Sequence, residues 1–302
     1  MKTLRLATRK SALALAQSRM VAADIMKLNP GLTIEEVQVV TQGDRVTDRA
    51  LSEVGGKGLF VKEIEEALLA GRADFAVHSM KDLPAELAPG LVVACVPPRE
   101  SPWDLLVTRD GLSLDALPKG ARVGTSSKRR EIALKALRPD LDVRMLRGNV
   151  DTRLRKLTEG EYDAVILAEA GVRRLGLAPT AVRLEGALVP AIAQGALALE
   201  CRSDDAETAA IVGRYHDARA SIETVAEREV MRRLGGSCVV PMGALARWND
   251  SRDALSMTGF FATDDGARWV RAEHTGAARN DDEARAVGDA LADKLAALLA
   301  KA

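Results

Sequence analysis

Short apolar runs alternate with longer amphipathic segments over the first two thirds of the chain. This alternation is typical of α/β proteins, in which helices cover the faces of a largely parallel sheet. The apolar runs predict strands and the segments between them predict helices. The expected strands are 4–7, 33–41, 75–78, 91–96, 104–108, 122–124, 142–146 and 164–168, and the expected helices are 11–27, 61–70, 128–137 and 150–157.

The pattern breaks at Pro97-Pro98 and then restarts, which predicts a second α/β domain. Residues 191–201 predict a further strand that could cross back to the first domain. Residues 204–234 are helical in pattern. Three strand-like runs separated by turn-rich stretches follow, and then an Ala/Leu-rich helix. Those runs are 239–247, 254–262 and 268–274, and the helix is 281–302.

The fold class predicted from this pattern is α/β, with a small C-terminal α+β domain that contains a three-stranded antiparallel sheet. We expect a first α/β lobe, a second α/β lobe and a C-terminal domain. Their boundaries are 1–97 with 197–214, 98–196, and 215–302.

The overall charge of the chain does not favour a polyanionic partner, and it excludes few classes of protein. The 302 residues contain 43 Lys and Arg and 43 Asp and Glu, so the formal net charge is zero. The four Phe, three Trp and two Tyr are few for a protein that stacks on single-stranded nucleic acid. We expect no nucleic-acid partner and no membrane partner.

Cysteine and histidine do not form a metal-binding pattern. The three cysteines lie far apart and the three histidines are scattered, so we expect no metal site. These residues are Cys95, Cys201, Cys238, His78, His216 and His274. The odd cysteine count, the first residues without a signal-peptide core, and the lack of a membrane-length apolar run favour a cytoplasmic protein.

The most informative segment is the predicted strand 75–78 and the polar residues that follow it. Lys81 and Asp82 come at the carboxyl end of this strand, and Pro84 prevents its continuation. Ligands of open α/β sheets bind at the carboxyl ends of strands. A carboxylate at this position could perform acid–base chemistry, although a solvated turn with an exposed Lys-Asp pair fits the spacing equally well.

Basic side chains follow four predicted strands, and three of these groups lie at the start of a helix. Helix N-termini bind anions, and arginine binds carboxylates through two parallel hydrogen bonds. A solvated helix face would explain one such group, but four together predict a cleft for a ligand with several carboxylates or phosphates. The groups are Arg9-Lys10, Lys128-Arg129-Arg130, Arg147 with Arg153 and Arg155, and Arg173-Arg174.

Two further segments could belong to the site. The glycine-rich stretch 53–62 could be a lid that carries Lys57 and Phe60, or a plain flexible connection. Cys238 follows Gly235-Gly236 at the end of a predicted helix, where a thiolate could be exposed and reactive. We expect Cys95 and Cys201, in apolar runs, to be buried and inert.

Taken in order, these motifs resemble those of porphobilinogen deaminases, also called hydroxymethylbilane synthases. The resemblance covers nearly the whole chain. Its motifs are Thr8-Arg9-Lys10-Ser11 with Leu13-Ala14-Leu15 and Gln17, 54–60, His78–Pro84, Gly124–Arg130, Leu146–Leu154, Gln194-Gly195-Ala196 and the Cys238 loop.

The resemblance implies a transferase that joins four porphobilinogen molecules into the linear tetrapyrrole hydroxymethylbilane and releases ammonia at each addition. It implies a dipyrromethane cofactor joined to Cys238 through a thioether. It also implies a monomer with two lobes like those of periplasmic binding proteins and a third domain that carries the cofactor loop. The carboxylates of each pyrrole ring would explain several arginine clusters in a chain of zero net charge.

The resemblance also implies roles for individual residues. Asp82 matches the catalytic aspartate, which would stabilise the positive charge that develops as ammonia leaves. The residues matched to cofactor binding are Lys81, Ser127, Arg129, Arg130, Arg147 and Arg153. Those matched to substrate binding are Arg9, Ser11, Arg174 and Gln194.

The sequence departs from some relatives at positions outside these groups. Glu53 and Gln42 replace basic residues, and Ser237 and Ala193 replace glycines beside Cys238 and Gln194. These departures affect the expected loop motion and rate but not the expected reaction.

Two other classes of protein share part of the pattern. A non-catalytic two-lobed anion-binding protein would use the same arginine-lined cleft, but it would need neither the Cys238 loop nor Asp82. A nucleic-acid-binding protein could use residues 128–130, but the charge balance and the few aromatics weigh against it.

Overall fold

The computed structural model describes residues 2–41, 61–235 and 240–302, and these form two compact units. The first unit contains the described residues up to Glu100 together with Ala196–Ile222. The second contains Ser101–Gly195, Glu223–Gly235 and 240–302. The chain therefore leaves the first unit after Glu100 and returns to it after Gly195.

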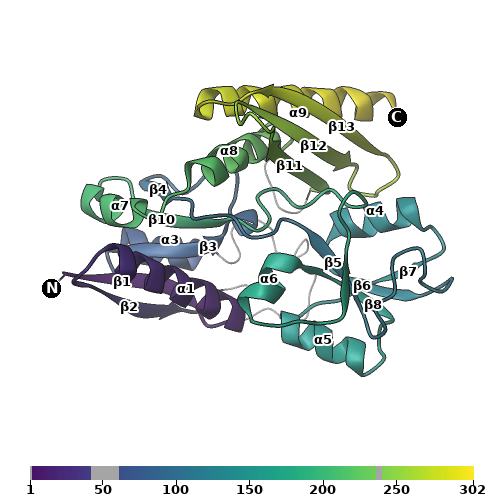
Figure 1. The fold of residues 1–302 in the computed structure, drawn as a ribbon, viewed down its shortest axis with the longest axis horizontal. Coiled ribbons are helices and arrows are strands. Elements are labelled where there is room, and N and C mark those ends of the chain that lie inside the picture. The colour runs from purple at the N-terminus through teal and green to yellow at the C-terminus, as the bar shows by residue number, and fades with distance from the viewer. Residues whose placement is uncertain (1, 42–60, 236–239) are drawn as a thin grey trace. The chain divides into compact units, whose positions relative to one another are not determined.

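The first unit is built on a five-stranded sheet with the order β2-β1-β3-β10-β4 (Figure 1). β1 is parallel to β2 and β3, whereas β10 is antiparallel to β3 and β4. The strands are β1 (Lys2–Arg9), β2 (Leu32–Val39), β3 (Phe75–Ser79), β4 (Leu91–Cys95) and β10 (Leu197–Arg202). The helices are α1 (Ala12–Leu28), α3 (Lys62–Leu69) and α7 (Ala206–Gly213).

The second unit contains a five-stranded sheet with a matching arrangement, in the order β7-β6-β8-β5-β9. β6 is parallel to β7 and β8, and β5 is antiparallel to β8 and β9. The strands are β5 (Asp104–Thr108), β6 (Arg122–Thr125), β7 (Asp142–Met145), β8 (Ala164–Ala168) and β9 (Ala181–Arg183). The helices are α4 (Lys128–Leu137), α5 (Val150–Thr158) and α6 (Glu169–Arg174).

Four of the five strands in each sheet run in the same direction, which confirms the prediction of largely parallel sheets, and one strand in each, β10 or β5, is antiparallel to its neighbours. The physical reason for the antiparallel strand is the path of the chain. β5 enters its sheet directly after the first crossing between the units, and β10 enters directly after the return crossing. Neither strand follows a βαβ connection within its own sheet, so the rule that makes such connections parallel does not apply to them.

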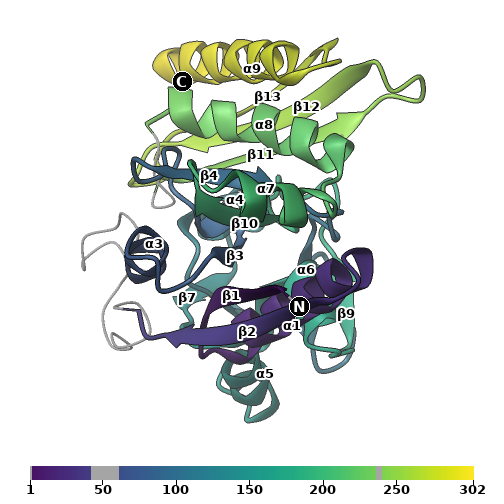
Figure 2. The same cartoon turned by 90° about the vertical axis from the view of Figure 1, so that its left-hand side faces the viewer.

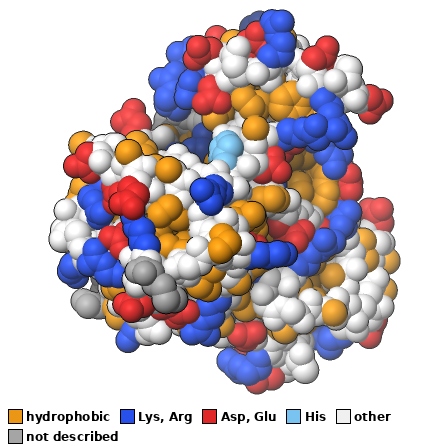
Figure 3. Space-filling view, turned by 60° about the vertical axis from the view of Figure 1, so that its left-hand side comes forward, with side chains coloured by type: hydrophobic (Ala, Val, Ile, Leu, Met, Phe, Trp, Pro, Cys, Tyr) orange, Lys and Arg blue, Asp and Glu red, His pale blue; other side chains and the backbone are white. Residues whose placement is uncertain are grey.

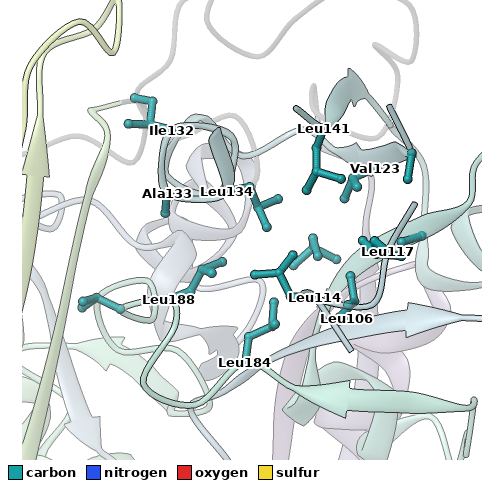
Figure 4. Packing of buried hydrophobic residues seen from close by; sticks show 14 of the residues in the cluster. Leu106, Leu114, Leu117, Val123, Ile132, Ala133, Leu134, Leu141, Leu184 and Leu188 are labelled. Atoms are coloured by element: carbon teal, nitrogen blue, oxygen red, sulfur yellow. The ribbon is translucent and has the colours of Figure 1, made fainter. Parts of the chain in front are cut away.

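Apolar side chains of the second sheet and its helices form a closely packed core (Figure 4). Leu106 of β5, Val123 of β6 and Leu134 of α4 are completely buried within it. Phe260 and Ala262 belong to the same cluster, although they lie in the C-terminal sheet. This shared core explains why the C-terminal elements and the second lobe form one compact unit.

The C-terminal part of the second unit is an antiparallel sheet covered by a long helix. The sheet has the order β11-β12-β13, and α9 lies along it in both views (Figures 1 and 2). The elements are α8 (Ala218–Arg233), β11 (Met242–Trp248), β12 (Ala254–Ala262), β13 (Trp269–Ala277) and α9 (Asp281–Lys301). This arrangement confirms the predicted α/β class with a C-terminal three-stranded antiparallel sheet.

The helical pattern predicted over 204–234 is confirmed, and it is divided into two helices, α7 and α8. The Asp217 carboxylate accepts hydrogen bonds from the backbone N–H groups of Arg219 and Ala220 at 2.9 and 3.0 Å. Asp217 therefore caps a new helix start, a role for which aspartate is well suited. Among the described residues, no helix has both the length and the apolar character required to span a bilayer.

Candidate active site

The predicted catalytic aspartate lies on a short turn directly after β3. The 3-10 helix Met80–Asp82 begins where the strand ends at Ser79. Met80 and Leu83 are buried, with 2% and 1% of their surfaces exposed, whereas Asp82 is exposed. Two apolar residues thus fix this segment to the core and leave the Asp82 carboxylate at the surface. We call residues 80–83 the aspartate turn.

Asp82 lines a small pocket of about 80 Å³ in the first unit, together with side chains predicted to bind the substrate. Arg9 reaches it from the end of β1, which is parallel to β3, so both strands end at the same edge of the sheet. Ser11 also lines the pocket, and its Oγ accepts a hydrogen bond from Ala14 N at 3.3 Å to cap α1. The structure therefore brings together Arg9, Ser11 and Asp82.

His78 lines this pocket and forms a buried acid–histidine pair with Glu200, which was not predicted from the sequence. His78 Nε2 lies 2.9 Å from Glu200 Oε2, and both residues are buried. The other Glu200 oxygen is buried and has no hydrogen-bond partner in the part of the chain that the structure describes. Burial and the charge of Glu200 raise the pKa of the nearby Glu65. A lone acidic residue inside the apolar strand β10 was the only sequence signal for this pair.

In the second unit, two of the predicted cofactor-binding arginines are held by a buried aspartate. Asp104 Oδ2 accepts from Arg129 Nη2 at 2.9 Å, and Asp104 Oδ1 accepts from Arg130 Nη2 at 2.7 Å. Arg129 also donates to Val189 O at 2.5 Å, and Arg130 donates to Ile166 O at 3.1 Å. We call Asp104, Arg129 and Arg130 the arginine anchor.

The charge balance of the arginine anchor keeps its aspartate ionised. Burial alone raises the pKa of Asp104, but the two guanidinium charges and the hydrogen bonds from Arg130 and Gln194 outweigh it, so the pKa lies well below the usual range. β5 is antiparallel to β8, so its first residue, Asp104, lies beside the carboxyl end of β8, opposite Ala168. Asp104 was not among the site residues predicted from the sequence, although a charged residue at the start of an apolar strand can indicate a buried ion pair.

Two further predicted arginines carry positive charge without a carboxylate partner among the described residues. Arg147 Nη1 is buried and has no hydrogen-bond partner there. Arg153 Nε donates to Gly148 O at 2.8 Å. Partial burial, together with the like charges of Arg130 and Arg147, lowers the pKa of Arg153 to about 10. Charges that repel one another in this way favour an anion that could bind between them.

The remaining predicted residues of the second unit take local positions that the fold explains. Ser127 caps α4, and its Oγ accepts a hydrogen bond from Arg130 N at 3.5 Å. Arg174 Nη2 donates to Gly195 O at 2.7 Å. Gln194 is buried, and its Nε2 donates to Pro102 O at 2.7 Å and to Asp104 Oδ1 at 2.9 Å.

The described cysteines are poor nucleophiles. Cys95 and Cys201 are buried, as predicted. Burial raises the pKa of Cys95 to about 12, and burial with the charge of Asp205 raises the pKa of Cys201 to about 11. Cys238, Lys57 and Phe60 lie outside the described residues, as do Gln42, Glu53 and Ser237.

The surface is mixed in charge, and the described residues offer no metal centre. Acidic and basic side chains are interspersed on the face drawn in Figure 3, in keeping with the zero net charge. No group of three or more His, Cys, Asp or Glu side chains in the described part of the chain is arranged to hold a metal ion.

Comparison with protein families gives two matches. The model described as "Porphobilinogen deaminase, dipyromethane cofactor binding domain" matches residues 4–210, and "Porphobilinogen deaminase, C-terminal domain" matches residues 221–297. Porphobilinogen deaminase of Sorangium cellulosum is 53% identical over 89% of this chain and 90% of that protein. The enzyme of Bacillus pumilus is 44% identical over 98% of this chain and 94% of that protein.

Comparison with solved structures gives weaker similarities. The LysR-family regulator CbnR matches with a TM-score of 0.44 and 14% identity, covering 72% of this chain and 70% of that chain. The sulphonate-binding protein SsuA of Escherichia coli matches with a TM-score of 0.38 and 16% identity, covering 77% of this chain and 70% of that chain.

Proposed function

The chain belongs to the porphobilinogen deaminase family, and we propose that its described residues divide the family's reaction between two half-sites. It is a transferase of tetrapyrrole biosynthesis. It joins four porphobilinogen molecules head to tail into hydroxymethylbilane, releases ammonia, and uses a dipyrromethane cofactor. The assignment of these steps to individual residues is the proposal.

Asp82 is the catalytic residue of the first half-site. The observation that supports this role is the position of its exposed carboxylate in a pocket shared with Arg9 and Ser11. A carboxylate there stabilises the positive charge that develops on the substrate pyrrole as ammonia leaves. It also accepts and returns protons during bond formation. Arg9 and Ser11 hold the substrate's carboxylates beside it.

The second half-site fits a cofactor that carries several carboxylates. An anion would accept a hydrogen bond from the buried Arg147 Nη1, which has no partner among the described residues. Its negative charge would also offset the burial and like charges that lower the pKa of Arg153. The residues of this unit that would hold the cofactor are Ser127, Arg129, Arg130, Arg147 and Arg153. Lys81, which the resemblance also assigns to cofactor binding, belongs to the first unit. When bound, the cofactor supplies the pyrrole ring to which the first substrate is added.

Arg129 and Arg130 have a specific part in this half-site. Several of their donors already bind Asp104 and backbone carbonyls, so they act mainly as a fixed positive charge. Arg147 and Arg153 have fewer protein partners and are better placed to bind carboxylates directly. Arg174 and Gln194 belong to the substrate-binding set of the same unit.

Some assignments concern residues that the structure does not describe. We propose that Cys238 carries the cofactor through a thioether, as the resemblance implies, and the burial and raised thiol pKa values of Cys95 and Cys201 support this choice. We propose that Lys57 and Phe60 belong to a lid over residues 53–62. The three-domain division at 1–97 with 197–214, 98–196 and 215–302, the monomeric state and a cytoplasmic location are also proposals.

The intact mass of the natively purified protein, followed by peptide mapping, tests the cofactor assignment. We expect a mass excess equal to a dipyrromethane on the peptide that contains Cys238. A chain without the adduct would be incubated with porphobilinogen and measured again. If no adduct formed on Cys238 even then, the assignment of the cofactor to this residue would be wrong.

A further inference from the structure

Four consecutive residues at the return crossing, 193–196, each make a hydrogen bond to a different part of the protein. The sequence analysis placed this stretch inside a strand that started at 191, but β10 begins only at Leu197. Ala193 and Gly195 instead adopt positive φ values of +56° and +89°. Ala193, Gln194 and Ala196 are almost completely buried. We call residues 193–196 the connector.

On the second-unit side, the connector is fixed to α8, to the start of β5 and to α6. Ala193 N donates to Glu227 Oε2 at 2.6 Å, and Glu227 Oε1 accepts from Ala246 N at 2.9 Å. Gln194 Nε2 donates to Asp104 and also to Pro102 O, next to the first crossing. Gly195 O accepts from Arg174.

On the first-unit side, the connector is fixed to the aspartate turn. Met80 N donates to Ala196 O at 3.0 Å. Leu197 is paired with Ser79 in the β3–β10 ladder, so this bond extends the ladder by one residue into the turn. Met80 is the first residue of the turn that ends in Asp82.

From these contacts we propose that Gln194 is a positioning residue that couples the arginine anchor to the aspartate turn. Its amide donates to the Asp104 oxygen that also accepts from Arg130, so it helps to fix the anchor. Its backbone precedes Gly195 and Ala196, the latter of which is bonded to Met80. The effect on turnover rests on the proposed function, whereas the coupling itself does not.

A positioning role for Gln194 predicts different results from a role in substrate contact alone. If Gln194 only bound substrate, its loss would raise KM and leave the aspartate turn unchanged. If it were only structural, its loss would lower stability without changing the activity of the folded protein. A positioning role predicts faster exchange of the Met80 amide hydrogen and a lower kcat, because the catalytic carboxylate would be less well held.

The test compares Gln194→Met, which keeps the length of the side chain but removes its amide, with Thr108→Val. Thr108 is a buried residue at the opposite end of β5, and its Oγ1 accepts a hydrogen bond from Leu112 N. Hydrogen exchange of peptides that span Met80 is measured in the holoenzyme without substrate, and kcat and KM are measured separately. If Gln194→Met does not fold, Gln194→Asn replaces it, because it keeps the amide but shortens its reach.

We expect Gln194→Met to speed exchange at Met80 about threefold or more and to lower kcat about tenfold. Thr108→Val should change neither. Unchanged exchange at Met80 in a folded Gln194→Met protein would overturn the coupling, whatever happens to KM. Faster exchange with an unchanged kcat would support the coupling but argue against Asp82 as the catalytic group. The coupling and the catalytic role of Asp82 are therefore tested separately.

Discussion

The backbone N–H of Ala193 donates to the buried Glu227 carboxylate at 2.6 Å, although Ala193 itself holds a φ of +56°. This left-handed conformation is costly for a residue with a Cβ, and it persists here because buried contacts hold the connector on both sides of Ala193. The hydrogen bond to Glu227 uses only backbone atoms of Ala193, so it would survive removal of the Cβ.

Ala193→Gly should therefore relieve strain. Glycine gains about 1 kcal/mol from the favourable φ but loses part of it through the greater entropy of the unfolded chain. We expect the free energy of unfolding to rise slightly or stay unchanged, as measured by urea denaturation. A loss of more than about 1 kcal/mol would show that the Ala193 methyl group packs usefully in the core.

Asp82→Asn should abolish most turnover without unfolding the protein. The side chain is exposed, so the amide fits, but it no longer stabilises positive charge or accepts a proton. We expect kcat to fall by about two to four orders of magnitude, with an unchanged circular dichroism spectrum. Glu86→Gln, a change of a nearby exposed carboxylate, is the control and should keep normal turnover. Near-normal kcat in Asp82→Asn would exclude the catalytic role.

Arg147→Met should impair acquisition of the cofactor more than it impairs folding. The substitution removes a buried guanidinium nitrogen that has no hydrogen bond within residues 2–41, 61–235 and 240–302, so little internal bonding is lost there. We expect the apoprotein to take up the dipyrromethane adduct at least about tenfold more slowly, followed by intact mass after addition of porphobilinogen. Arg144→Met removes an exposed charge from β7 and serves as the control. Equal rates in both variants would argue against a cofactor contact at Arg147.

The ion pair between Arg122 and Asp163 should make the free energy of unfolding decrease as the pH falls toward 2. Hydrogen bonds from Arg122 lower the pKa of Asp163 to about 2, below the unfolded value of about 3.9. The stabilisation is therefore complete above the unfolded pKa and is lost as pH falls through about 2. We expect Asp163→Asn to cost about 1 kcal/mol at pH 7, since the carboxylate is partly exposed.

Urea denaturation of the wild type and Asp163→Asn at several pH values tests this dependence. The difference between their free energies of unfolding should stay constant from pH 7 to about pH 5 and shrink toward pH 2. If the difference between the two free energies of unfolding grew as the pH fell, the expected direction of the pH dependence would be wrong.

Gly288→Ala should weaken the packing of α9 against α8. A Cβ at Gly288 would lie 2.3 Å from the backbone oxygen of Ala226, which cannot move without shifting the helix. We expect a loss of about 1–3 kcal/mol in the free energy of unfolding. Gly213→Ala in α7 meets no atom within 4 Å and should be neutral or slightly stabilising, because alanine favours helix. Equal effects of the two changes would contradict this account of the packing.

Local patterns were sufficient to predict most elements of the fold. β5, β8, β12 and α4 have the predicted bounds, because apolar runs and strong helix formers dominate in them. α6 and β9 were missed, since six and three residues are too few for a periodic pattern. The antiparallel direction of β5 and β10 was not predicted, because it depends on where the chain crosses between the units.

The site shows the same division between local and long-range information. Arg9, Ser11 and Asp82, which line one pocket, could be predicted because each lies at the end of a recognisable strand or the start of a helix. The pairings of Glu200 and Asp104 could not be predicted, because Glu200 lies 122 residues from His78, and Asp104 lies 25 and 26 residues from Arg129 and Arg130. Sequence patterns also gave no sign that Gln194 is bonded to Asp104.

The deep burial of two of the three cysteines has a practical consequence for handling the protein. Thiols with pKa values near 12 and 11 are almost entirely protonated at pH 8, and their burial also blocks reagents. Rapid labelling of the native chain by a thiol reagent would thus report on Cys238 alone. If the thioether forms there, the fraction of molecules that react quickly would measure how much of a preparation lacks its cofactor.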